Sequence, residues 1–157
     1  VILRPFNTYG PRETLPYFIP TMIRQCLKEK MIRVGNLTAS RDFTFVDDTC
    51  EAMILTLETS NIEGGIFNVG SGVTRSMKDI LELIQRETNT LDKPIIEDDM
   101  RFRPNGVQLL CCDNRKIEDM VGWAATTSFE KGLKRTIDWY RKVGAWSYEK
   151  RWLYSDR

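Results

Sequence analysis

Apolar side chains recur at intervals of three and four residues in several stretches of the chain, which is the spacing of one face of an amphipathic α-helix. The pattern predicts helices over residues 17–29, 49–57 and 77–87, a short helix from Asp113 to residue 120, and a last helix from Thr127 to residue 143. Small polar residues stand where these helices would begin. We therefore expect N-caps at Asp47 or Asp48, Ser76, Asp113 and Thr127.

Short runs of apolar and β-branched residues separate the helical stretches. They predict strands over residues 1–3, 32–34, 43–46, 66–69 and 94–96, and extended chain over 107–112. Because the two patterns alternate along the chain, we predict an α/β fold with a small mixed sheet and helices. The length suits one domain, so residues 1–157 are expected to form a single unit. The pattern leaves the order of strands in the sheet open.

The charges of the chain almost cancel, with 23 Lys and Arg residues against 22 Asp and Glu residues. A protein that binds nucleic acid through counterion release needs a surplus of cations, so we expect no nucleic-acid partner. The apolar runs are too short to cross a bilayer and no apolar leader opens the chain, so we expect a cytoplasmic protein without a membrane partner. With no histidine and no Cys-x-x-Cys spacing, we expect no metal site.

No self-contained catalytic centre is visible in the sequence. No tyrosine has a lysine four residues later, the arrangement that lets a tyrosine act as a base in some dehydrogenases. A Gly-x-Ser-x-Gly elbow and a histidine base are absent as well. The segment 70–76 stands between a strand and a helix like a dinucleotide-binding turn, but it lacks the third glycine of that pattern. We predict a sharp turn and a helix cap there, and no catalytic residue in the chain.

A set of arginines and asparagines stands beside turns and strand ends: Arg4, Asn7, Arg12, Arg41, Asn68, Arg101 and Arg103. Guanidinium and amide groups bind diphosphate and ribose oxygens well. The first loop, which Pro5, Gly10, Pro11 and Pro16 keep irregular, contains several of these residues, and loops of this kind carry function. The set predicts a site for an anionic ligand.

Five motifs in a fixed order resemble the extended short-chain dehydrogenase/reductases that act on nucleotide-sugars. They are Arg-Pro-Phe-Asn-Thr-Tyr-Gly-Pro at 4–11, Arg-Asp-Phe-Thr-Phe-Val-Asp-Asp at 41–48, Phe-Asn-Val-Gly-Ser-Gly at 67–72, Arg-Phe-Arg-Pro at 101–104, and the segment 113–123 that ends in Gly-Trp. The resemblance spans nearly the whole chain. It implies that the chain is the C-terminal, substrate-binding portion of a Rossmann-like fold whose NAD-binding domain lies upstream, as the opening strand 1–3 without a preceding turn also suggests.

The resemblance assigns roles to individual residues. It implies that Asn7, Arg41 and Arg103 hold the diphosphate and ribose of a nucleotide-diphosphate sugar and that Asn68 contacts the nucleotide. It implies that Phe18, Ile32 and Val34 contact the base. The backbone around Pro5 and Thr8 would lie beside the nicotinamide of NAD or NADP. The resemblance implies that the upstream part makes most of the contacts with this cofactor. The family's dinucleotide-binding glycines and its Tyr-x-x-x-Lys pair are not present in this sequence.

The wording of the first two motifs most resembles 4,6-dehydratases, of UDP- or GDP-linked N-acetylhexosamines or of dTDP-glucose. The resemblance implies a homodimeric, NAD-dependent enzyme of carbohydrate biosynthesis, in which this chain alone is inactive. A 4-epimerase and a UDP-glucuronate decarboxylase share the same nucleotide-binding residues, so both stay open. A stand-alone binding or interaction module without catalysis is an alternative of another class.

Overall fold

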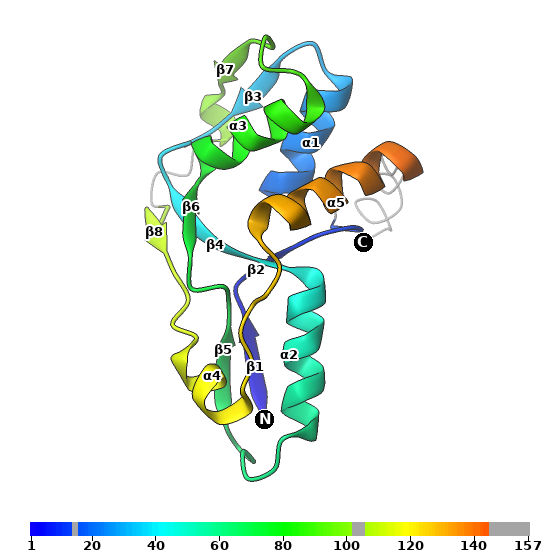
Figure 1. Cartoon of the computed structure of the whole chain (residues 1–157). Coiled ribbons are helices and arrows are strands. Elements are labelled where there is room, and N and C mark those ends of the chain that lie inside the picture. The colour runs from blue at the N-terminus through cyan, green and yellow to red at the C-terminus, as the bar shows by residue number, and fades with distance from the viewer. Residues whose placement is uncertain (14–15, 102–105, 145–157) are drawn as a thin grey trace, which may run out of the picture.

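The computed structural model describes residues 1–13, 16–101 and 106–144. In chain order its elements are β1 (Ile2–Pro5), β2 (Asn7–Tyr9), α1 (Phe18–Lys28), β3 (Ile32–Val34), β4 (Ser40–Phe45), α2 (Val46–Glu58), β5 (Ile66–Val69), β6 (Thr74–Ser76), α3 (Met77–Thr88), β7 (Ile95–Glu97), the 3₁₀ turn η1 (Asp99–Arg101), β8 (Leu109–Leu110), α4 (Arg115–Val121) and α5 (Phe129–Val143). The helices and most strands lie where periodicity predicts them. This arrangement confirms the α/β class (Figure 1).

The strands form three small sheets. β1 pairs with β5 in parallel, and β3 pairs with β7 in parallel. β4 is the centre of the third sheet, where β2 and β8 are its parallel partners and β6 its antiparallel partner. This third sheet is therefore mixed, as expected. Figure 1 shows β1 and β5 with α2 and α4 at one end of the molecule, and β3 and β7 with α1 and α3 at the other.

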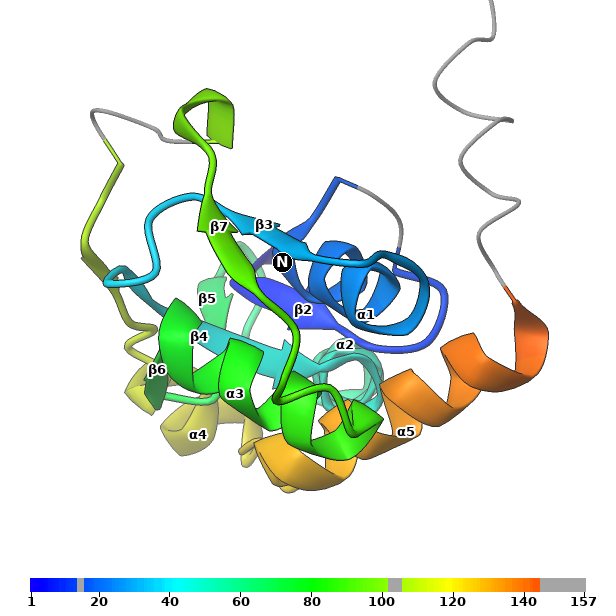
Figure 2. The same cartoon turned by 90° about the horizontal axis from the view of Figure 1, so that it is seen from above.

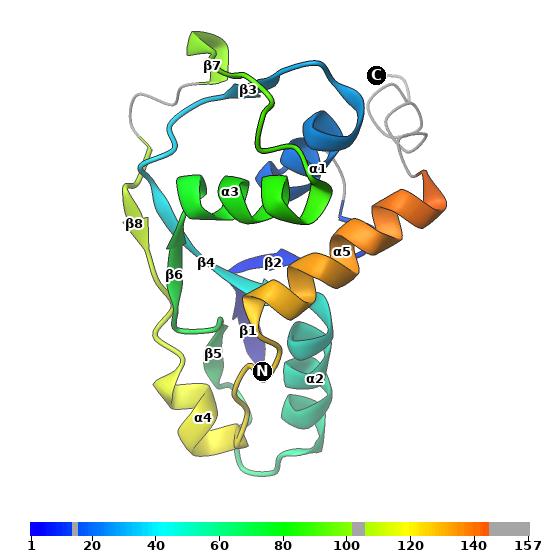
Figure 3. The same cartoon turned by 45° about the horizontal axis from the view of Figure 1, so that its top comes forward.

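Each end of the molecule has its own apolar cluster. The larger contains Ile23 of α1, Ile32 of β3, Ile80 of α3 and Ile137 of α5, all at most 1% exposed. Seen from above, the β3–β7 pair lies next to α1 and α3 (Figure 2). Figure 3 shows α3 between that pair and the strands β2 and β4. The smaller cluster packs Phe67 of β5 against Trp123, which follows α4.

Two strands escaped prediction. β2 lies inside the Pro- and Gly-rich loop, where Asn7, Thr8 and Tyr9 pair with Phe43, Thr44 and Phe45. β6 lies between the glycine turn and α3, where its residues pair with β4. Both are only three residues long and gain their hydrogen bonds from a distant segment, so local composition carries little signal for them.

The expected caps of α2 and α5 are wrong. α2 begins one residue before Asp47, which instead pairs with Arg135 at 2.8 Å. Asp48 is buried and accepts hydrogen bonds from the backbone N–H and the hydroxyl of both Thr126 and Thr127. Its carboxylate therefore binds the chain before α5 and caps nothing. Because Thr127 is engaged there, Ser128 caps α5 instead.

Of the other two expected caps, one is confirmed and one is wrong. The Ser76 hydroxyl accepts from the backbone N–H of Asp79 and caps α3, as predicted. Asn114 precedes α4, so Asp113 is not its N-cap; the Asp113 carboxylate instead accepts from the backbone and side chain of Arg115. Among the described residues, no helix is both long and apolar enough to cross a membrane.

Candidate functional site

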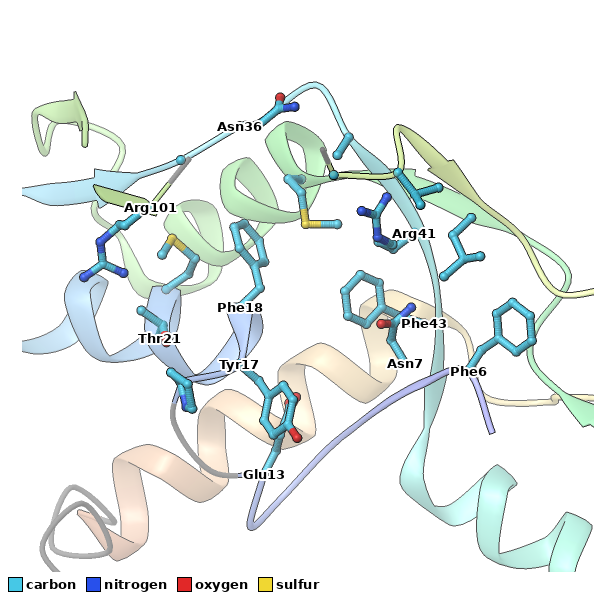
Figure 4. Close-up of a pocket in the computed structure, with 18 of the residues that line it drawn as sticks. Phe6, Asn7, Glu13, Tyr17, Phe18, Thr21, Asn36, Arg41, Phe43 and Arg101 are labelled. Carbon is cyan, nitrogen blue, oxygen red and sulfur yellow. The ribbon is translucent and has the colours of Figure 1, made fainter. Parts of the chain in front are cut away.

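A cleft of about 990 Å³ opens between β2, the start of α1, β4 and the segment around η1 (Figure 4). Its described lining includes Pro5, Phe6, Asn7, Thr8, Glu13, Tyr17, Phe18, Thr21, Arg33, Gly35, Arg41, Phe43, Met100 and Arg101. Segments far apart in the sequence meet here, and most of them are loops or strand ends. A volume of this size suits a ligand larger than a single sugar.

Strand pairing places the first polar group of the cleft. Asn7 of β2 stands directly opposite Phe43 of β4, so the two side chains share one face of the sheet. Arg41 lies two residues before Phe43 and therefore points to the same face. Figure 4 shows Asn7, Arg41 and Phe43 gathered at one end of the cleft.

The two polar side chains at this end are held in place by backbone oxygens. The Asn7 amide donates to the Asp42 carbonyl oxygen at 2.8 Å, which leaves it one more N–H. The Arg41 guanidinium donates through Nη1 to the Ser40 carbonyl oxygen at 2.8 Å and to that of Gln108 at 3.4 Å. No carboxylate of the described residues forms an ion pair with Arg41, whose other N–H groups can therefore receive an anion.

Positive charge dominates the described lining of the cleft. Arg33, Arg41 and Arg101 contribute three guanidinium groups, and Arg101 is partly offset by Asp98 at 3.3 Å. Glu13 is the one acidic residue among the described lining residues. Burial raises the pKa of its carboxyl to about 8, so at neutral pH this group is protonated and does not cancel the arginines. Such a cleft attracts a diphosphate.

Five of the nine residues that the sequence analysis assigned to ligand or cofactor line the cleft: Pro5, Asn7, Thr8, Phe18 and Arg41. Ile32 and Val34 do not, because both are at most 1% exposed and pack in the larger apolar cluster. Their placement against a base is therefore corrected: only Arg33, between them, faces the cleft.

Asn68 and Arg103 are the other two predicted residues. Asn68 lies on β5, where its amide donates to the Asp113 carbonyl oxygen at 3.4 Å, and it is not part of the cleft. Arg103 lies outside the described residues.

Among the cleft residues that the sequence did not predict are Glu13, Tyr17, Thr21 and Arg33. The signal for Arg33 was present, because in Ile-Arg-Val the two apolar side chains share one face and the arginine takes the other. Gly35 follows at a point where an added Cβ would stand 2.4 Å from the Arg101 carbonyl oxygen, so this lining segment approaches η1 closely. Nothing in the local sequence distinguishes Glu13 or Thr21 from solvated polar residues.

The glycine turn after β5 does not offer its N–H groups to a phosphate. The buried Asp42 carboxylate accepts from the backbone N–H of Ser71 at 3.0 Å and of Gly72 at 2.9 Å. It also accepts from the Ser71 hydroxyl at 2.6 Å and from the backbone N–H of Cys112 at 3.1 Å. The turn was predicted, and an internal carboxylate fills the position that a cofactor phosphate would need.

The described residues fit a contact with one edge of a nicotinamide cofactor and no more. Pro5 and Phe6 give an apolar border to the cleft, and Phe6 donates its backbone N–H to Val69. The Thr8 hydroxyl bonds to the Phe6 carbonyl oxygen and lies 3.2 Å from that of Thr49, so it is already engaged. Within the described ranges no group of three or more metal-binding side chains exists.

The sequence matches the family described as GDP-mannose 4,6 dehydratase over residues 1–136. It is 32% identical over 149 residues to a UDP-N-acetyl-alpha-D-glucosaminuronate decarboxylase of Bacillus cytotoxicus, covering 90% of this chain and 46% of that protein. It is 29% identical over 151 residues to a dTDP-glucose 4,6-dehydratase of Xanthomonas campestris, covering 89% and 42%. These matches confirm the resemblance read from the five motifs.

The fold is similar to that of UDP-glucuronic acid 4-epimerase from Bacillus cereus, solved in complex with UDP-glucuronic acid and NAD. The TM-score is 0.84 at 28% identity, and the match covers 91% of this chain and 45% of the epimerase. The chain thus spans less than half the length of each of these three relatives. Their names give three different activities, each on a nucleotide-sugar.

Proposed function

Because the chain belongs to the GDP-mannose 4,6 dehydratase family, we propose that it is the nucleotide-sugar-binding part of an NAD-dependent nucleotide-sugar 4,6-dehydratase. The observation that carries the proposal is the convergence of Asn7 and Arg41 in one cationic cleft that also contains aromatic side chains. The amide and the guanidinium would hold the diphosphate. Phe18 and Tyr17 would cover the base or the ribose.

The contribution of this chain to catalysis would be orientation. Bound NAD would accept a hydride from the sugar and return it later in the reaction. The residues of this chain would fix the diphosphate, so that the sugar lies at the Pro5 and Thr8 end of the cleft in one orientation. A 4-epimerase and a decarboxylase need the same grip, and the relatives include both activities. These two reactions are therefore the alternatives.

We also propose that a dinucleotide-binding domain precedes these residues in the natural protein, since the chain spans less than half the length of these relatives. β1 and β5 form a sheet of only two strands, and Ile2, Ile54 and Leu57 on β1 and α2 are 55% to 87% exposed. A two-stranded sheet is marginal on its own, and further strands would cover this surface. The homodimeric state that we propose for the complete enzyme rests on the resemblance, and its cytoplasmic location rests on the shortness of the apolar runs.

The test of the grip is Arg41→Ala in the natural full-length protein. Loss of hydrogen bonds to a charged diphosphate should weaken nucleotide-sugar binding by roughly 1.5 to 3 kcal/mol. Isothermal titration calorimetry with UDP-, GDP- and dTDP-sugars measures this change and identifies the base. The matched control is Arg86→Ala on the exposed face of α3, which should leave affinity unchanged. Equal affinities of wild type and Arg41→Ala would remove Arg41 from the site.

A second test concerns chemistry. Residues 1–157 alone should neither reduce NAD nor convert a nucleotide-sugar. The described cleft residues include no tyrosine–lysine pair that could act as the base, and the Asp42 carboxylate already binds the N–H groups of the glycine turn that a cofactor phosphate would need. Product analysis of each nucleotide-sugar by chromatography checks this, with the full-length protein as the positive control. Turnover by the 157-residue chain would contradict the proposal that this chain binds the substrate and that the catalytic residues lie elsewhere in the full-length protein.

A further inference from the structure

Two buried oxygen atoms in the wall of the cleft have no hydrogen-bond partner: Oε2 of Glu13 and Oγ1 of Thr21. Thr21 is only 6% exposed, so solvent does not compensate its hydroxyl. A buried polar group without a partner destabilises a fold, and native proteins keep few of them. Two such groups in the lining of one cleft indicate that a ligand completes them.

The two groups flank the same residue. The backbone N–H of Thr21 donates to the Tyr17 carbonyl oxygen at 3.1 Å, so Thr21 lies one helical turn beyond Tyr17. Glu13, four residues before Tyr17, lines the same cleft (Figure 4). Tyr17 itself is 64% exposed and free to stack on a ligand. Figure 4 shows Thr21 on the other side of the cleft from Arg41.

The position of Glu13 is fixed from two sides. Its backbone N–H donates to the Gly10 carbonyl oxygen at 3.2 Å and closes a turn in which Arg12 has φ 72°. The Tyr140 hydroxyl of α5 donates to the Glu13 carbonyl oxygen. The backbone of Glu13 is thus held by hydrogen bonds to Gly10 and from Tyr140, while one oxygen of its carboxyl has no protein partner.

We propose that Glu13 and Thr21 determine ligand specificity by binding an amide-type group, an N–H next to a C=O, on the nucleotide-sugar. This inference rests on the proposed function and adds a recognition contact to it. Such a group occurs on the base and in the N-acetyl substituent of an amino sugar. Both sources offer the same donor and acceptor pair.

The chemistry of the two side chains favours this ligand over an anion. Burial raises the pKa of the Glu13 carboxyl to about 8, so the group is protonated at neutral pH, and it also has a backbone hydrogen bond with Gly10. Its oxygen without a partner, Oε2, can therefore act as an O–H donor or as an acceptor. The Thr21 hydroxyl can likewise donate and accept. Two groups with this double capacity complement adjacent N–H and C=O groups. A phosphate has acceptors only, and it would lose its attraction as soon as the carboxyl ionised.

The experiment uses the natural full-length protein with Thr21→Val and Glu13→Met, which keep size and remove polarity. Calorimetry with UDP, dTDP and GDP tests the base, and UDP-glucose against UDP-N-acetylglucosamine tests the N-acetyl group. We expect each variant to weaken the same probe by about tenfold, as for one lost hydrogen bond. A loss that is equal with and without the sugar assigns the base. A loss confined to UDP-N-acetylglucosamine assigns the N-acetyl group.

Three further variants separate recognition from folding. Thr44→Val removes another buried hydroxyl without a partner, on the β4 face that points away from the cleft, and should leave every affinity unchanged. Glu87→Gln, on the exposed surface of α3, is the control for Glu13. Glu13→Gln retains a donor and an acceptor and should bind within about threefold of wild type. If Glu13→Met does not fold, Glu13→Leu takes its place, because the leucine side chain also lacks a donor and an acceptor.

The outcomes distinguish this inference from the proposed function. Wild type that binds none of the probes refutes both. Wild type that binds, with either Thr21→Val or Glu13→Met within twofold of it for every probe, overturns the specificity site and leaves the proposed function standing.

Discussion

Replacing Asp42 by Asn should destabilise the protein far more than the loss of one charge on its surface. The Asp42 side chain is 0% exposed and accepts four hydrogen bonds, two on each carboxylate oxygen. Asparagine has one carbonyl oxygen, so its NH₂ must face either Ser71 or the pair of N–H groups of Gly72 and Cys112. In either orientation at least one backbone N–H loses its acceptor inside the protein.

The size of the effect follows from these contacts. An unsatisfied buried N–H costs about 1–3 kcal/mol, and each remaining bond loses the assistance of the negative charge, which roughly doubles a hydrogen bond. The Ser71 hydroxyl can turn and accept from the new NH₂, so we take the orientation that faces Ser71. The sum is about 3–5 kcal/mol of unfolding free energy, a large part of the stability of a domain.

Urea unfolding of the natural protein measures the change, with the same dependence on urea expected for wild type and variant. Asp113→Asn is the control: it also removes a carboxylate and its bonds to Arg115, but on the exposed surface, and should have a much smaller effect. Hydrogen exchange should show faster exchange at the amides of Ser71, Gly72 and Cys112. Equal destabilisation by Asp42→Asn and Asp113→Asn would refute the assignment of these four bonds as a structural anchor.

Two further predictions concern Glu13 and Gly132. Because burial raises the Glu13 pKa from 4.5 to about 8, the folded chain holds a proton that the unfolded chain releases between these values, so stability falls as pH rises through this window. The loss of unfolding free energy has an upper limit of roughly 5 kcal/mol. Urea unfolding of wild type and Glu13→Gln at pH 5 and pH 8 should show a smaller change of stability with pH in the variant. Equal changes with pH in both proteins would exclude a buried Glu13 carboxyl with a raised pKa. Gly132→Ala should destabilise by about 1–3 kcal/mol, because its Cβ would stand 2.3 Å from the Tyr9 hydroxyl and 2.7 Å from the Phe45 ring. Thermal unfolding tests it, and an unchanged midpoint would show that α5 does not pack this closely on β2 and β4.

Helices and buried strands could be predicted because their signal is local. α1 and α3 begin and end within a residue or so of the bounds that periodicity gave, and the strands 32–34 and 66–69 agree with β3 and β5. In each, the apolar side chains that pack in a core also define the pattern. The pattern failed where the stabilising partner was remote, as in β2, which depends on β4 for its hydrogen bonds.

The caps failed for a related reason. Asp48 and Thr127 have the composition of helix caps, but they bind each other across 79 residues of sequence. A carboxylate that finds several buried N–H and O–H donors gains more than one that caps a helix in water. Local rules therefore select the right residue types and assign them the wrong partners.

The site was only half predictable. Motif resemblance selected Asn7 and Arg41, which the pairing of β2 with β4 brings into one cleft. It also selected Ile32 and Val34, although their alternation with Arg33 already indicated that they face the core. Glu13 and Thr21 could not have been selected, because their distinguishing property is the absence of a hydrogen-bond partner in a packed wall.

Successive side chains of β4 point alternately into the cleft and into the protein interior, so adjacent residues serve ligand binding and stability in turn. Arg41 and Phe43 point into the cleft, while Asp42 and Thr44 are buried on the other face. Asp42 anchors the glycine turn and Cys112, and its carbonyl oxygen holds the Asn7 amide. A substitution at Arg41 should therefore change affinity at constant stability, whereas one at Asp42 should change stability first. Since Asn7 is oriented by the Asp42 backbone and not by its carboxylate, any folded Asp42→Asn protein should still bind its ligand through Asn7 and Arg41.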